Sequence, residues 1–327
     1  MAVSDTLVEA KNASALAEFG ELLSSAGVYD LSNRARFSFT GKDRVRWLNG
    51  MITNNIRDLA VGQGVYAFLL TPQGKIQGDL FAYNRGESIA VDVDRSQLPK
   101  VLETLKRYII MDKVEIAEES VAAIGVAGPD AAKFLANALG NEKVAELMLL
   151  QFIEITWNGV DVTVLRGDCP LLPAFELWIE PSQASNLKSA LKAKQVSLEA
   201  VELLRIASGV PRYGQDIHDR DLPQETQQAR ALNFTKGCYI GQEIVERIRA
   251  RGGVHRMFTG FHVEGELPAV GTKIQAEGKD VGEITSVATL PNGPVALGYI
   301  RREVAAKELT AGAASVKVAS LPFDRLQ

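Results

Sequence analysis

Three short runs of β-forming residues, each separated from the next by a tight turn, constrain the fold of this chain more than any other feature. Glycine-containing turns of this length join antiparallel neighbours. We therefore predict an antiparallel meander, with apolar residues at helical spacing over 98–109 forming a helix that covers its apolar face. Strands with one covering helix make an α+β layer. The three predicted strands are residues 65–71, 76–83 and 88–93, with turns at 72–74 and 84–86.

A second set of strands and helices follows the same order along the chain. The segment Asp94-Arg95-Ser96-Gln97 aligns with Glu180-Pro181-Ser182-Gln183, 86 residues later. The match indicates either a duplication or the same residue preferences where a strand leads into a helix. Pro129 occupies the first position of a predicted helix, where proline is favoured. The further predicted strands are 122–127, 152–157, 160–166 and 175–180, and the further helices are 15–26, 43–50, 129–139 and one ending near 194.

From about residue 257 the pattern changes to short alternating runs with turns such as Pro291-Asn292-Gly293. This pattern is typical of an all-β barrel. We predict two α+β regions, residues 1–118 and 119–250, that are interleaved, followed by a C-terminal barrel over 251–327. The predicted barrel strands are residues 258–263, 273–276, 281–288, 295–299 and 316–319.

The composition restricts the function classes. A net charge of -4 gives no overall basic field for nucleic acid, although one basic cluster stands out. That cluster predicts an anion site, a nucleic-acid contact or simply a solvated surface. No segment approaches the roughly 20 apolar residues of a membrane span, and three scattered histidines predict no structural zinc. The cluster is Arg247, Arg249, Arg251, His255 and Arg256.

The chain has two cysteines, Cys169 and Cys238. Two thiols in 327 residues provide no disulfide framework and favour a reducing compartment, so we expect the cytoplasm. Cys169 lies between a predicted strand and Pro170, and we interpret it as incidental.

Cys238 lies in the run Lys236-Gly237-Cys238-Tyr239-Ile240-Gly241-Gln242-Glu243, just before a predicted helix. The unpaired N–H groups of a helix start and a nearby ammonium, here from Lys236, favour a thiolate. Gly237 and Gly241 allow a sharp turn or a close approach to a ligand. The alternative is a small buried thiol at a helix start, as free cysteines often are.

A long connection follows a predicted helix that Ser197 caps and Gly209 ends. It runs over residues 211–226 and mixes polar, aromatic and glycine residues without periodicity. Such a connection is either a loop that lines a ligand or a surface linker.

Several of these segments together resemble the YgfZ branch of the YgfZ/GcvT folate-binding family. The resemblance implies an aminomethyltransferase-like ring of two α+β domains and a C-terminal β-barrel around a tetrahydrofolate pocket. The segments are residues 236–243, Arg251-Gly252-Gly253, Arg256, Arg205 with Gly209-Val210-Pro211, Thr53-Asn54, Gly74-Lys75-Ile76, Asp79-Leu80 and Ala296-Leu297-Gly298-Tyr299.

The family contains aminomethyltransferases of glycine cleavage and, in the YgfZ branch, folate-dependent factors that support the synthesis or repair of iron–sulfur enzymes, including tRNA-modifying ones. The cysteine motif favours the second class. Gly78 precedes Asp79 where transferases carry paired aspartates, so a classical aminomethyltransferase is the alternative, with a tRNA-binding module as a third hypothesis.

The resemblance also implies the site residues. Cys238, Lys236 and Asp79 would carry the chemistry, and the family's usual pterin-binding glutamate falls at Ala207. A carboxylate there would accept the amidine-like N–H edge of the pterin. We expect a monomer with folate and iron–sulfur client enzymes as partners and no membrane contact. The folate-binding residues would be Tyr213, Arg205, Lys236, Gly237, Gly241, Gln242, Glu243, Arg249, Arg251 and Arg256.

Overall fold

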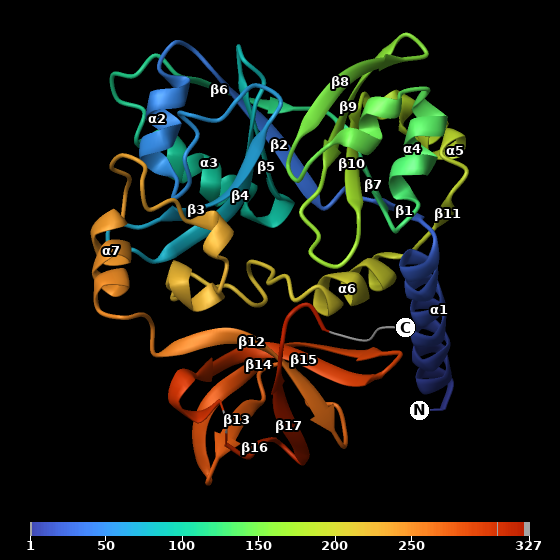
Figure 1. The fold of residues 1–327 in the computed structure, drawn as a ribbon, viewed down its shortest axis with the longest axis vertical. Helices are drawn as coiled ribbons and strands as arrows, with labels where there is room; N and C mark the ends of the chain where they lie inside the picture. Colours follow the sequence, from blue (N-terminus) through green and yellow to red (C-terminus); the bar gives the residue numbers. More distant parts are fainter. Residues whose placement is uncertain (1, 306, 324–327) are drawn as a thin grey trace.

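The structure, a computed structural model, describes residues 2–305 and 307–323, with side chains described from residue 11 onward. Its strands form two open sheets and one closed barrel (Figure 1). The two sheets lie side by side, and the barrel lies across from both of them, with the helix α6 (Leu198–Ala207) between. This confirms the predicted α+β fold with a C-terminal barrel.

The first sheet contains the predicted meander. Strand β4 (Ile76–Asn84) pairs antiparallel with both β3 (Gly64–Leu70) and β5 (Ile89–Asp94). Helix α3 (Leu98–Arg107) buries one apolar face, as predicted, but ends before residues 108 and 109. The sheet has the order β3-β4-β5-β2-β6, and its remaining elements are β2 (Arg34–Thr40), β6 (Glu115–Glu119) and the helix α2 (Arg44–Met51).

The second sheet begins with a strand from the N-terminal part of the chain. Strand β1 (Gly27–Asp30) lies in this sheet, so the chain passes through it, builds the first sheet and then returns. The sheet has the order β11-β1-β7-β10-β9-β8, with β7 (Ala122–Ala127), β8 (Phe152–Trp157), β9 (Val160–Arg166), β10 (Ala174–Ile179) and β11 (Lys194–Gln195). Its helices are α4 (Ala131–Leu139) and α5 (Ala184–Ala190).

The sequence match at an offset of 86 residues has a local structural explanation. The carboxylates of Asp94 and Glu180 each accept a hydrogen bond from a backbone N–H two residues later, at Ser96 and Ser182. Both therefore cap a 3-10 turn that leads from a strand into a helix. This shared capping accounts for the match.

The C-terminal barrel is closed and has six strands. The sequence pattern identified five of them and missed the three-residue β16 (Leu309–Ala311). The order around the barrel is β12-β15-β14-β13-β16-β17, with β12 (Arg256–Glu264), β13 (Lys273–Ala276), β14 (Lys279–Leu290), β15 (Gly293–Arg301) and β17 (Ala314–Ala319).

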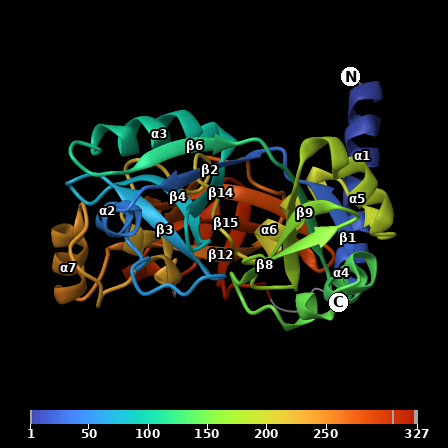
Figure 2. The ribbon, with the colours of Figure 1, turned by 90° about the horizontal axis from the view of Figure 1, so that it is seen from above.

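Helix α6 joins the parts of the molecule. Ser197 caps it as predicted, because its hydroxyl accepts a hydrogen bond from the N–H of Ala200 at 3.3 Å. Its apolar residues share one core with the helix α1 (Ala2–Ser24) and with the barrel. Figure 2 shows α1 and the helix α7 (Gln242–Ala250) at opposite ends of the molecule. No helix among the described residues is both long and apolar enough to cross a membrane.

Candidate functional site

A cavity of about 210 Å³ lies where the first sheet, the end of β9 and the segment after α6 meet. The first sheet contributes Tyr66 and Asp79, and the segment after α6 contributes Tyr213. Segments more than 140 residues apart in the sequence thus line one space. We call this space the central cavity.

Asp79 is held firmly at the wall of the central cavity. Tyr66 donates its phenolic hydrogen to Oδ2 at 2.7 Å, and the side-chain amide of Gln97 donates to Oδ1 at 2.7 Å. Burial raises the pKa of Tyr66 well above its usual value, so the phenol remains a donor. Both oxygens of Asp79 therefore already have partners from the protein.

The glycine before Asp79 leaves room for its neighbours. A Cβ atom at Gly78 would lie 3.0 Å from Oε1 of Gln97 and 3.1 Å from Cγ2 of Val101. Both neighbours belong to the segment that covers the sheet, and Gln97 is fully engaged with Asp79. A second carboxylate at position 78 would require these side chains to move.

Tyr213 and Arg205 lie in the central cavity, as the resemblance implied, and each is anchored by other groups. The hydroxyl of Tyr213 donates to the carbonyl of Gln77 at 2.9 Å and accepts from Lys100 at 2.9 Å. Arg205 forms ion pairs of 2.7 Å with Glu202 and with the buried Asp216. Arg205 thus connects α6 to the barrel side of the cavity, since it also donates to Ser286.

Two further charged residues of the central cavity were missed by the sequence analysis. Arg230 lies with its guanidinium 5.3 Å from the ring centre of Tyr66, and it forms a 2.9 Å ion pair with Asp168. Burial raises the pKa of Asp168, while Arg230 opposes that shift. In the sequence, the one signal for this pair is an acidic residue two positions after a predicted strand.

Ala207, where the resemblance places a glutamate, does not face the central cavity. It is fully buried in the core shared by α1, α6 and the barrel. Its carbonyl accepts a hydrogen bond from the N–H of Phe323 at 2.9 Å. Glu202, one helical turn earlier, is occupied by Arg205 and Arg212.

The segment from Lys236 to Glu243 contributes no residue to the lining of the central cavity and packs against the first sheet. The ammonium of Lys236 is buried and donates to the carbonyls of Asn49, Ile52 and Asn54 at 2.6–2.7 Å. An ammonium has three donors, and all three are used. Burial lowers the pKa of Lys236 to about 7. Its position identifies it as an anchor of the loop between α2 and β3.

Gly241 makes the turn into α7, as its position before a helix suggested. Its φ of 83° is a left-handed conformation that favours glycine. A Cβ atom there would lie 2.6 Å from the carbonyl oxygen of Thr71. The close approach is therefore to the turn between β3 and β4. Gln242 accepts from the N–H of Tyr239, and Glu243 pairs with Arg247, so neither reaches the central cavity.

Cys238 is exposed and free, which excludes the alternative of a buried thiol. Gly237 beside it is also exposed, and no atom lies within 4 Å of where its Cβ would be. The thiol is three residues before the N-cap of α7 and carries no disulfide. Cys169 is half-buried and lies 3.4 Å from the hydroxyl of Ser208.

The predicted basic cluster is largely neutralised by acids. Arg249 lies 3.5 Å from Glu246, and the guanidinium of Arg256 pairs with Asp221 and Glu225. Arg256 also stacks over the ring of Tyr299 at 4.8 Å. These pairs leave little net positive charge, which weakens the hypothesis of a nucleic-acid contact. Arg251 and His255 remain exposed.

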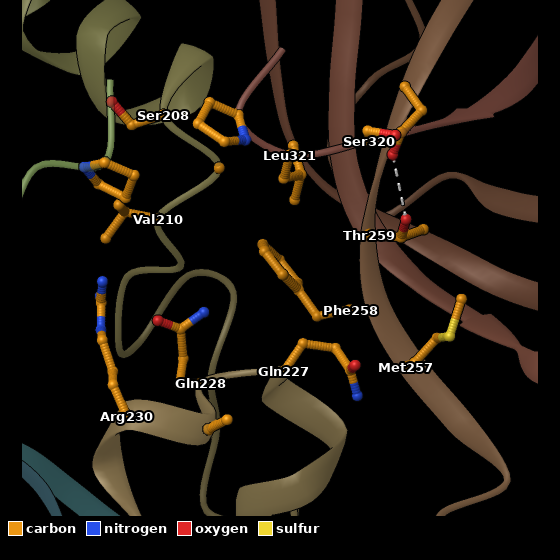
Figure 3. Close-up of a pocket in the computed structure, with 15 residues that line it drawn as sticks. Ser208, Val210, Gln227, Gln228, Arg230, Met257, Phe258, Thr259, Ser320 and Leu321 are labelled. Atoms are coloured by element: carbon orange, nitrogen blue, oxygen red, sulfur yellow. Dashed lines mark hydrogen bonds between the residues drawn. The ribbon is translucent and has the colours of Figure 1, made fainter. Parts of the chain in front are cut away.

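A second cavity of about 470 Å³ adjoins the central cavity (Figure 3). Val210 and Arg230 line both of them. Phe258, Met257 and Leu321 line this space from the barrel side, and Gln227 and Gln228 line it from the segment just after the long connection. Within the long connection, Pro211, Arg212 and Tyr213 line the central cavity, so the alternative of a plain surface linker is excluded.

Comparisons with known proteins agree with this architecture. The family of the GCVT N-terminal domain matches residues 8–236, and the C-terminal β-barrel domain of CAF17 matches residues 253–323. The tRNA-modifying protein YgfZ of Yersinia enterocolitica is 32% identical over 281 residues, which cover 81% of this chain and 81% of that protein. An aminomethyltransferase of Rubrobacter xylanophilus is 28% identical over 289 residues, covering 86% of this chain and 77% of that protein.

One solved structure shows the same fold over nearly the whole chain. Glycine cleavage system aminomethyltransferase T from Bartonella henselae matches with a TM-score of 0.86 and 23% identity. The match covers 94% of this chain and 89% of that protein.

Proposed function

We propose a folate-dependent accessory role for this chain, which belongs to the YgfZ/GcvT family by its GCVT N-terminal domain, its C-terminal barrel and its YgfZ relatives. In this proposal the protein binds a tetrahydrofolate in the central cavity and supports the synthesis or repair of iron–sulfur enzymes, including tRNA-modifying ones. Both cysteines are free, which suits a reducing compartment such as the cytoplasm.

The lining of the central cavity supports the proposed binding of folate. Aromatic rings from Tyr66 and Tyr213 offer flat surfaces to a planar ligand, and Asp79 and Asp168 bring carboxylates to the same walls. Most of the other lining residues are polar or charged, and the apolar ones are Phe81, Val201, Val210 and Pro211, so the cavity suits a ligand rich in polar groups. The pyrimidinone ring of a reduced pterin is flat and carries several N–H donors. It is therefore complementary to the tyrosine rings and the carboxylates of the cavity wall.

Gly78 favours an accessory role over a transferase role. Gln97 and Val101 occupy the space that a second acid beside Asp79 would need. The side-chain amide of Gln97 instead fixes the one carboxylate that is present. The site is therefore built around a single aspartate on β4.

In this proposal, Cys238 takes part in thiol–disulfide exchange with a client protein. As a thiolate it would attack a disulfide of a client protein and form a mixed disulfide, while one client thiolate leaves. No net oxidation is needed for this exchange. Its exposure makes the thiol accessible to a large partner.

Titration of tetrahydrofolate into the purified protein tests the folate part, with saturable binding expected. Deletion of the gene should lower the activity of iron–sulfur enzymes in cells. Cys169→Ala should restore that activity and Cys238→Ala should not. Full rescue by Cys238→Ala would refute the thiol role.

An aminomethyltransferase of glycine cleavage is the second candidate, because relatives with that name are similar over most of the chain. An assay with a lipoylated carrier protein bearing the aminomethyl group decides this candidate. Release of ammonia that depends on tetrahydrofolate would replace the accessory role with a catalytic one.

A further inference from the structure

One carboxylate oxygen of the central cavity is buried without a hydrogen-bond donor. The side chain of Asp168 is only 4% exposed, and its Oδ1 accepts from Arg230 at 2.9 Å. No described residue donates to Oδ2. An ionised carboxylate is acceptor-only, and a buried acceptor without a donor is costly to the protein.

The other carboxylates that line the central cavity lack this property. Both oxygens of Asp79 accept hydrogen bonds, from Tyr66 and from Gln97. In Asp94, Oδ1 accepts from the N–H and the hydroxyl of Ser96, and Oδ2 is not among the buried atoms without a partner. Among the described residues that line the cavity, Asp168 alone has a buried polar side-chain atom without a partner.

Asp168 is also held in a fixed orientation. It follows β9, where the N–H of Gly167 donates to the carbonyl of Ala174 at 2.8 Å and closes the connection to β10. Its partner Arg230 stacks over Tyr66, and the side chain of Asn54 donates to the carbonyl of Arg230 at 2.8 Å. The carboxylate of Asp168 is thus held in one orientation by the protein, as a specificity-determining group must be.

We propose that Asp168 is the specificity-determining acceptor of the central cavity and receives the planar N–H edge of the ligand, which is the 2-amino and N3–H edge of a reduced pterin. Oδ2 accepts one hydrogen bond, and the remaining lone pair of Oδ1 accepts the second beside Arg230. This inference rests on the proposed function and assigns its recognition contact to a residue in the connection between β9 and β10.

The ion pair between Asp168 and Arg230 favours a neutral donor edge over a cation. Arg230 already balances the charge of Asp168, so a ligand that brought a second positive charge would lie close to the guanidinium. A neutral amidine-like edge fills the unused acceptor sites without adding charge. The expected ligand class is therefore a 2-aminopyrimidinone such as a pterin.

Calorimetric titration of tetrahydrofolate into the wild type and Asp168→Asn tests this inference. The substitution keeps the size of the side chain and replaces one acceptor oxygen with a donor. We expect affinity to fall roughly 10- to 100-fold, as for loss of hydrogen bonds to a charged group. Asp161→Asn, an exposed residue at the start of β9, is the matched control and should bind like the wild type.

A second probe does not depend on the folding of the variant. The wild type should bind 2-desamino-2-methyl-tetrahydrofolate, which lacks the 2-amino donors, roughly 10-fold more weakly or worse than tetrahydrofolate. Asp168→Asn should lose this preference. Equal affinity of the wild type for both compounds, or an unchanged affinity and preference in Asp168→Asn, would overturn the inference. If the wild type binds neither compound, the proposed function fails as well.

Discussion

The central cavity and the segment around Cys238 are built in opposite ways. The cavity combines side chains from distant parts of the chain, such as Tyr66, Asp168 and Tyr213, and leaves acceptor capacity unused. The segment from Lys236 to Glu243 is continuous in sequence, and most of its side chains are committed to neighbouring protein groups, with Cys238 exposed. The most distinctive motif of this chain, residues 236–243, thus mainly forms a platform for one thiol, whereas the lining of the central cavity comes from other parts of the chain.

The platform should be the more sensitive region to substitution. Lys236→Met would leave the carbonyls of Asn49, Ile52 and Asn54 without their donor, and each unsatisfied buried acceptor costs about 1–3 kcal/mol. We expect the free energy of unfolding to fall by at least about 3 kcal/mol in urea denaturation. Lys106→Met, at an exposed position of α3, is the control. A loss below about 1 kcal/mol would mean that the platform does not depend on this anchor.

The second prediction concerns the turn into α7. Gly241→Ala combines a left-handed φ with a Cβ 2.6 Å from the carbonyl of Thr71, so we expect a loss of about 2–3 kcal/mol in thermal or urea unfolding. Gly214→Ala has a similar φ of 85° but open space around the new Cβ, and it should lose only about 1 kcal/mol. Equal losses would show that contact with the β3–β4 turn is unimportant.

The third prediction tests whether the two regions act separately. Saturating tetrahydrofolate should change the alkylation rate of Cys238 by iodoacetamide less than about twofold, because the thiol lies on the surface outside the cavity. Mass spectrometry of labelled peptides measures both cysteines. Strong protection of Cys238 by folate would place the thiol at the ligand and contradict the view that the two regions act separately.

The smallest effect is expected from pH. Asp168 accepts the ligand only when ionised, and burial raises its pKa above the ordinary value, so affinity should decline as pH falls through that raised pKa. The charged and titratable groups that act on it are Arg230, which pairs with it, and Tyr66, whose pKa is in turn raised in part by Asp168. Calorimetry measures the affinity of the wild type and of Asp168→Asn for tetrahydrofolate from pH 7 down to acidic pH. The variant should not show the loss of affinity that comes from protonation of Asp168. A wild type and variant with identical pH profiles would contradict the assignment.

The sequence predicted elements wherever local patterns were strong. The meander from β3 to β5 has glycine turns and β-branched runs, and its pairing is as expected. Strand β1 was missed because its four residues are too few for a periodic pattern, and β6 because it is mostly acidic. Residues 15–26 were predicted as a helix that in fact extends from Ala2 to Ser24.

The candidate site was predicted only in part, for a physical reason. Asp79, Tyr213 and Arg205 were identified, and all three line the central cavity. Asp168 and Arg230 carry no local motif, because their importance arises from an ion pair between residues 62 positions apart. The burial of the Lys236 ammonium could not be predicted either, because its three acceptors come from residues 49–54, far away in the sequence.

One titration tests the central claim most directly. Tetrahydrofolate is titrated calorimetrically into the wild type, Asp79→Ala and Cys238→Ser. Ligand binding in the central cavity predicts saturable binding that Asp79→Ala weakens at least about tenfold, because loss of this carboxylate releases Tyr66 and Gln97 at the cavity wall. Cys238→Ser should leave the binding unchanged. Absence of binding, or binding that depends on Cys238 and not on Asp79, would contradict the account.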